Sequence, residues 1–169
     1  FGLFFSFLIV FLSVRNLRDT EILDKKIISF TFIQFFFVVI SFFGLIISFI
    51  NSDFSNETVF NHSHTTKPLF YKISGTWGNH EGSLLLWLLV LTLFISIFLF
   101  KSNHQPKKYR IFTLLFQQII IIGFFIFLIK TSSPFNYIFP TPNEGLGLNP
   151  ILQDPALAIH PPILYLGYV

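Results

Sequence analysis

Three long stretches without a charged residue constrain the fold of this chain more than any other feature. They are residues 27–52, 82–100 and 111–129, with 26, 19 and 19 residues. A helix needs about 20 apolar residues to cross the hydrocarbon core of a bilayer. The chain is also 53% hydrophobic and only 11% charged, whereas soluble domains carry about 25% charged residues. The sequence therefore predicts an all-α fold, a polytopic transmembrane helical bundle.

Two shorter apolar stretches at the ends are interpreted as partial spans. Residues 1–14 begin within an apolar run and resemble the last part of a span, and residues 161–169 are too few to cross a bilayer. We expect three complete spans plus partial first and last spans, within a single transmembrane helical region (1–169) of a larger protein. Gln117 and Gln118 interrupt the third complete span and are expected to face neighbouring helices rather than lipid.

The basic residues predict the orientation of the spans. The first loop (15–26) and the third loop (101–110) each carry four Lys or Arg residues. The second loop (53–81) is longer but carries two, and the fourth loop (131–160) carries none. Because positive charge marks the inner side of a membrane, the first and third loops should face the cytoplasm or matrix. The second and fourth loops should then share the outer side.

Several histidines have ordinary interpretations. His62 and His64 flank a serine, a spacing that binds metals weakly in a strand, but no third ligand follows them in the sequence. His104 lies among the lysines of the third loop, where a solvated side chain is expected. The chain contains no Cys, which excludes thiolate metal sites and disulfides within it.

The segment Thr76–Ser83 precedes the second complete span and permits two interpretations. Trp77 prefers the membrane interface, and Gly78 and Gly82 allow close backbone approach. In the first interpretation the segment is an anchor: His80 and Glu81 share a hydrogen bond, while Glu81 and Ser83 satisfy the first helical amides. In the second it belongs to a functional site. The residues alone favour the anchor.

The segment Asp154–Tyr165 contains two proline signals. A residue before proline is pushed out of the helical region, and proline is favoured in the first turn of a helix. We therefore expect Asp154-Pro155 to begin a short interfacial helix. Pro161 should begin the last span, with His160 at its mouth and the imidazole projecting outward. That imidazole suits either a helix cap or an axial ligand of haem iron, and the residues alone favour neither.

Two long motifs resemble signatures of the CcmF family, the haem lyases of cytochrome c maturation. They are 71–87 (YKISGTWGNHEGSLLLW) and 148–169 (LNPILQDPALAIHPPILYLGYV), in the family's order. The resemblance implies covalent attachment of haem to apocytochrome c on the outer side of the membrane, and it assigns His160 as the candidate axial ligand of haem iron. It assigns no catalytic residue. The remaining motif residues receive no role: Trp77, Gly78, His80, Glu81, Gly82, Asp154, Pro155, Pro161 and Pro162.

The expected function is therefore that of the N-terminal part of a haem lyase, which helps to position haem and is inactive alone. Its expected partners are membrane lipid, the remaining haem lyase segment, apocytochrome c and other maturation proteins, with no nucleic acid. The alternative is a non-catalytic structural subunit of a respiratory or transport complex. The resemblance implies a bacterial or a mitochondrial inner membrane. The 26 phenylalanines are the skew expected from an AT-rich genome, such as many organelle genomes. The mitochondrial inner membrane is the expected location, and the bacterial inner membrane the alternative.

Overall fold

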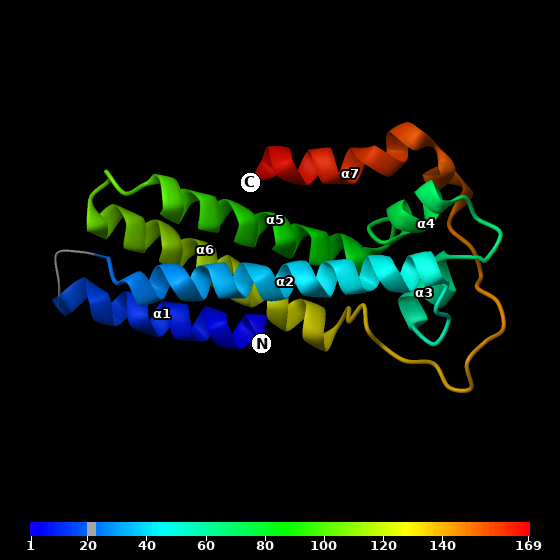
Figure 1. Cartoon of the computed structure of the whole chain (residues 1–169), viewed down its shortest axis with the longest axis horizontal. Helices are drawn as coiled ribbons and strands as arrows, with labels where there is room; N and C mark the ends of the chain where they lie inside the picture. The colour runs from blue at the N-terminus through cyan, green and yellow to red at the C-terminus, as the bar shows by residue number, and fades with distance from the viewer. Residues whose placement is uncertain (20–22) are drawn as a thin grey trace. The chain divides into compact units, whose positions relative to one another are not determined.

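The computed structural model describes residues 1–19 and 23–169, and within them every regular element is a helix (Figure 1). This confirms the all-α prediction. One isolated antiparallel bridge pairs Asn56 with Tyr137. The elements are α1 (Gly2–Asp19), α2 (Lys25–Asn51), α3 (Glu57–His62), α4 (Leu69–Gly75), α5 (His80–Lys101), α6 (Lys107–Lys130), the 3-10 helix η1 (Pro150–Gln153) and α7 (Pro155–Tyr168).

The three complete spans are confirmed as helices. Helices α2, α5 and α6 have 27, 22 and 24 residues and are long and apolar enough to cross a membrane. Each is longer than its charge-free run, because flanking polar or charged residues continue the helix: Lys25 and Lys26 in α2, His80, Glu81 and Lys101 in α5, and residues 107–110 and Lys130 in α6. Helix α7 has 14 residues, about 21 Å at 1.5 Å per residue, which is too short to cross a bilayer. Its length agrees with a partial last span.

The chain forms two compact units: residues 1–39 with 88–127, and residues 40–87 with 128–169. In the first unit, the Lys107 ammonium donates to the Asn16 carbonyl, which links the third loop to the first. In the second unit, Glu57 N donates to Asn136 O at 2.9 Å and Ile138 N to Ser55 O at 2.9 Å. These contacts bring the first loop to the third and the second loop to the fourth, as the predicted orientation requires. Residues 20–22 of the first loop lie outside the described residues.

A buried amide pair joins α2 and α6 in the first unit. Gln34 and Gln118 are both 0% exposed. Gln118 Nε2 donates to Gln34 Oε1 at 2.8 Å, and Gln34 Nε2 donates to Gln118 Oε1 at 3.2 Å. Gln34 also donates to the Ser6 hydroxyl of α1. The expectation that a glutamine of the third complete span faces a neighbouring helix is confirmed for Gln118, whereas Gln117 is half-buried.

Replacing Gln118 by leucine should destabilise the first unit by about 1 kcal/mol, because the buried Gln34 Oε1 loses the donor that Gln118 Nε2 supplies. The double change to Gln34→Leu and Gln118→Leu should cost less than the sum of the single changes, since neither amide is then left unpaired. Unfolding of the four proteins in mixed micelles measures this coupling. Additive effects would show that the pair does not stabilise the helix contact.

Candidate functional site

The second signature folds as helix α7, which begins where the sequence predicts. Asp154 is its N-cap, and Asp154 Oδ1 accepts from Ala156 N at 2.8 Å and Leu157 N at 3.1 Å. Pro155 follows in the first turn, where its missing N–H costs nothing. Asp154 and Pro155 therefore have a structural role, the start of the helix.

The expectation that a second helix begins at Pro161 is wrong. Helix α7 continues from Pro155 to Tyr168, with Pro161 and Pro162 inside it. His160 therefore lies within the helix rather than in an extended segment at its mouth. A proline inside a helix leaves the carbonyl four residues earlier without its amide donor, and the interruption costs about 3 kcal/mol. For Pro162 the carbonyl that loses its donor is that of Ala158.

A tertiary hydrogen bond replaces the donor that Pro162 lacks. The indole Nε1 of Trp77 donates to the Ala158 carbonyl at 2.7 Å, and Ala158 is 4% exposed. The Trp77 ring stacks on Phe42, with 6.4 Å between ring centroids and an angle of 19°. The prolines disfavour a continuous helix at this point. The hydrogen bond from Trp77, a residue of the first signature, offsets part of the free energy that the helix loses at Pro162.

A second pair of contacts fixes α7 farther along. The Tyr165 hydroxyl shares a hydrogen bond with the Ser83 hydroxyl. The Tyr165 ring lies 4.9 Å from the Trp87 ring between centroids, tilted by 32°. Trp77, Ser83 and Trp87 all belong to the first signature, and their partners belong to the second. The two signatures, 61 residues apart in the chain, therefore form one packed surface within the second unit.

The opposite face of α7 is an open apolar groove with an imidazole at one end. The groove has a volume of about 330 Å³ and is lined by His160, Ile163, Leu164, Gly167 and Tyr168. These positions follow each other at the three- and four-residue spacing of one helix face. Ile163 is 63% exposed and His160 is exposed as well. An accessible imidazole can bind a metal ion, and the apolar side chains beside it can cover an apolar macrocycle that holds this ion.

The start of α5 is organised by Asn79 rather than by the residues that the sequence favoured. Asn79 Oδ1 accepts from Gly82 N at 2.7 Å, and Asn79 Nδ2 donates to Gly75 O at 2.7 Å. Asn is a favoured residue at the N-cap of a helix, and here it bonds the Gly82 amide. The expectation that Glu81 and Ser83 cap the first helical amides is therefore wrong. His80 Nδ1 lies 3.2 Å from the Ser132 hydroxyl of the fourth loop.

His62 and His64 are separated by the structure. His62 ends α3 and lines a polar cavity, whereas His64 Nε2 lies 3.8 Å from Glu144 Oε2. Glu144 accepts from the Thr65 hydroxyl at 2.5 Å and from Thr65 N at 3.0 Å. The hydroxyl bond is the largest cause that lowers the pKa of Glu144 to about 2. Among the described residues, no three His, Asp or Glu side chains gather as a metal site.

Replacing Trp77 by phenylalanine should loosen α7, because the buried Ala158 carbonyl loses its donor at a cost of about 1–3 kcal/mol. The amides of 163–166 should exchange with solvent about tenfold faster or more, measured by hydrogen–deuterium exchange. Adding Pro162→Ala to this variant restores an intrahelical donor for the Ala158 carbonyl and should recover the protection. Equal exchange in the wild type and Trp77→Phe would show that this hydrogen bond does not hold the helix.

Comparison with known proteins places the second signature and most of the first in one family. Residues 77–169 match the model of the family described as Cytochrome C assembly protein. The cytochrome c-type biogenesis protein CycK of Bradyrhizobium diazoefficiens is 49% identical over 136 residues, which are 80% of this chain and 21% of that protein. The cytochrome c-type biogenesis protein CcmF of Escherichia coli is 40% identical over 144 residues, 83% of this chain and 22% of that protein.

A third relative, the cytochrome c-type biogenesis protein NrfE of Haemophilus influenzae, is 44% identical over 122 residues, 72% of this chain and 19% of that protein. The chain thus spans about a fifth of the length of these relatives. No solved structure matches it. The family match covers more than half of the chain and includes residues 77–87 of the first signature, all of the second signature, the buried contacts between them and the His160 groove. The chain therefore belongs to the Cytochrome C assembly protein family.

Proposed function

We propose that this chain acts in cytochrome c maturation as the N-terminal part of a haem lyase, where it helps to position haem for attachment to apocytochrome c. The observation that carries the proposal is the exposed His160 imidazole at the end of an apolar groove on α7. The names of the relatives as cytochrome c-type biogenesis proteins support it. They do not favour the alternative of a structural subunit in a respiratory or transport complex.

The residues of the groove fit a haem group. A ring nitrogen of His160 would supply one axial ligand to the iron, and Ile163, Leu164 and Tyr168 would cover apolar macrocycle surface. Gly167 leaves that surface uncovered by a side chain, and among the described residues nothing lies within 4 Å of a Cβ built there. Haem, when bound, supplies the reactive vinyl groups and iron, while the chain supplies orientation. Trp77 and Tyr165 act as positioning residues, since they hold the helix that carries His160.

The proposed setting is a multi-pass protein of the mitochondrial inner membrane or the bacterial inner membrane. Phenylalanine richness supports the first, and the bacterial origin of the relatives supports the second. The proposed partners are the remaining haem lyase segment, apocytochrome c and other maturation proteins. Isolating the tagged chain from its native membrane tests the proposal. Haem and maturation proteins should co-purify with it, and an assembly that contains respiratory subunits instead would contradict the assignment.

The second and fourth loops should face the outer side of the membrane, where haem attachment is proposed. Because the native chain has no Cys, single cysteines at positions 104 and 136 report on the two sides without background labelling. A membrane-impermeant maleimide should label position 136 from outside only and position 104 from inside only, in oriented vesicles. Labelling of both positions from one side would contradict this orientation.

A further inference from the structure

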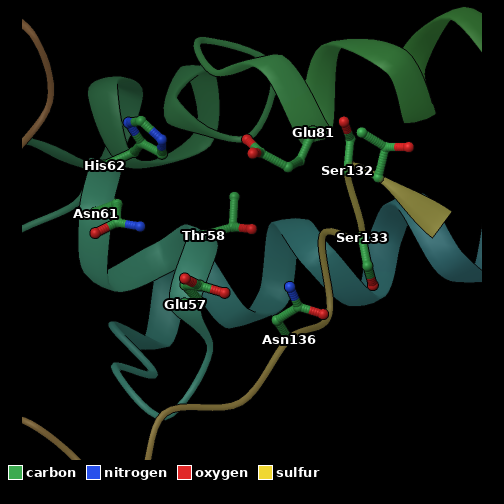
Figure 2. A pocket seen from close by; sticks show the side chains of 9 residues that line it. Glu57, Thr58, Asn61, His62, Glu81, Ser132, Ser133 and Asn136 are labelled. Atoms are coloured by element: carbon green, nitrogen blue, oxygen red, sulfur yellow. The ribbon is translucent and has the colours of Figure 1, made fainter. Parts of the chain in front are cut away.

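A polar cavity in the second unit lies apart from the His160 groove. Its volume is about 200 Å³, and Figure 2 shows that its walls come from α3, the start of α5 and the first part of the fourth loop. The proposed haem contact uses none of its side chains. The lining residues are Glu57, Thr58, Asn61, His62, Glu81, Thr131, Ser132, Ser133 and Asn136.

The charge of the cavity is negative and is not balanced by its walls. Glu57 and Glu81 have no side-chain hydrogen bond or ion pair with any described residue, and no Lys or Arg lines the cavity. Burial lowers the pKa of His62, which keeps its imidazole neutral near pH 7; the Glu81 carboxylate opposes this shift and nearby Lys67 adds to it. Two carboxylates in a partly enclosed space attract a cation more strongly than they would in open water.

Thr58 adds an independent sign of a ligand. It is only 4% exposed, its side chain lines the cavity, and in the view of Figure 2 it lies between the two glutamates. Its backbone N–H is bonded to Asn56 Oδ1 at 2.9 Å, but its hydroxyl has no hydrogen-bond partner within 1–19 and 23–169. The hydroxyl oxygen is not fully enclosed and is open to the cavity. It can therefore accept a hydrogen bond from a group bound there.

We propose that this cavity binds an alkylammonium group, the side chain of a lysine presented by a polypeptide. An ammonium carries one positive charge and three donors but no acceptor, which complements two carboxylates and a free hydroxyl. A metal ion fits less well, because the acidic and imidazole side chains of the described residues do not converge closely enough to form a metal site. The site goes beyond the proposed haem contact and does not depend on it.

Titration of the full chain in nanodiscs with N-acetyl-lysine methylamide tests the proposal. With ¹³C-labelled histidine, the chain gives five imidazole signals to follow by NMR. The His62 signal should shift in a saturable way, while the signal of His104 on the other side of the membrane should not. N-acetyl-norleucine methylamide, which lacks the ammonium, should leave His62 unchanged. No saturable shift, or an equal shift with norleucine, would overturn the proposal.

Isosteric variants assign the binding to this cavity. Glu57→Gln and Glu81→Gln should each raise the dissociation constant about tenfold or more, since each removes a charge-assisted hydrogen bond. Thr58→Val should weaken binding by a smaller factor. Asp24→Asn makes the same charge change in the first loop and should have no effect. Loss of binding in Asp24→Asn but not in the cavity variants would contradict the assignment of binding to this cavity. Saturation of the His62 shift by Ca²⁺ but not by the lysine analogue would contradict the assignment of the ligand. Haem retention, measured on the same samples, reports separately on the groove.

Discussion

Replacing His160 by alanine in the assembled protein should remove most of the haem bound at the outer surface and most cytochrome c maturation. Membrane insertion should remain normal. The imidazole is exposed on α7, so its removal leaves the packed face of the helix intact. An iron that loses an axial ligand loses both affinity and orientation. Haem content by pyridine haemochrome and the yield of mature cytochrome c measure the two effects.

Chemical rescue separates ligation from helix stability. His160→Gly leaves space for free imidazole, and added imidazole should recover part of the haem content and part of the activity. His104→Ala is the matched control in the exposed third loop, where the His104 ring contacts Gln105 at 3.1 Å, and it should be silent. If His160→Ala matures cytochrome c at the wild-type rate, the histidine is structural and the haem assignment is wrong.

The second large effect is expected from Gly82→Ala. A Cβ built on Gly82 would lie 1.6 Å from the Thr76 carbonyl oxygen and 2.8 Å from the Thr76 carbonyl carbon. Both atoms are backbone atoms, so relief requires the Thr76–Gly82 turn to open and the Asn79 cap to break. We expect a loss of about 3 kcal/mol or more. Unfolding in mixed micelles and the yield of folded protein measure it.

Gly123→Ala provides the matched control for this change. Gly123 lies within α6, and within the described part of the chain nothing comes closer than 4 Å to a Cβ built on it. Alanine there should stabilise the protein by about 0.5–1 kcal/mol, because glycine gives the unfolded chain more freedom. If the two alanine variants were equally stable, the close approach at Gly82 would not constrain the fold.

The spans could be predicted because a charge-free run of sufficient length has few folds available in lipid. The proximity of the first loop to the third and of the second to the fourth was also predictable. Successive spans place alternate loops on the same side of a membrane, and the lysines and arginines follow the same alternation. Helices α3 and α4 were missed within the second loop, although a signal for one of them was present. Asn56 caps α3 by accepting from Thr58 N and Val59 N, and an Asn before Glu-Thr is a readable helix start.

The continuous course of α7 could not be predicted from local rules. The rule for a residue before proline describes an isolated chain, and here a donor 81 residues away decides the outcome. The same limit applies to Ser83, whose hydroxyl was expected to cap α5 and instead meets Tyr165, 82 residues later. The candidate ligand His160 was found by resemblance to a family motif. The polar cavity joins residues from α3, α5 and the fourth loop, which no short motif connects.

The proline at position 162 makes the shape of α7 conditional on its neighbour. With alanine at position 162, the Ala158 carbonyl would have a donor within the helix whether or not the helix is docked. With proline, the Ala158 carbonyl is satisfied by Trp77 only when the helix is seated against the first signature. Folding of 155–168 and docking are therefore one event rather than two. We therefore expect the His160 imidazole to take the arrangement proposed for haem binding only when α7 is docked, and not in an unassembled chain.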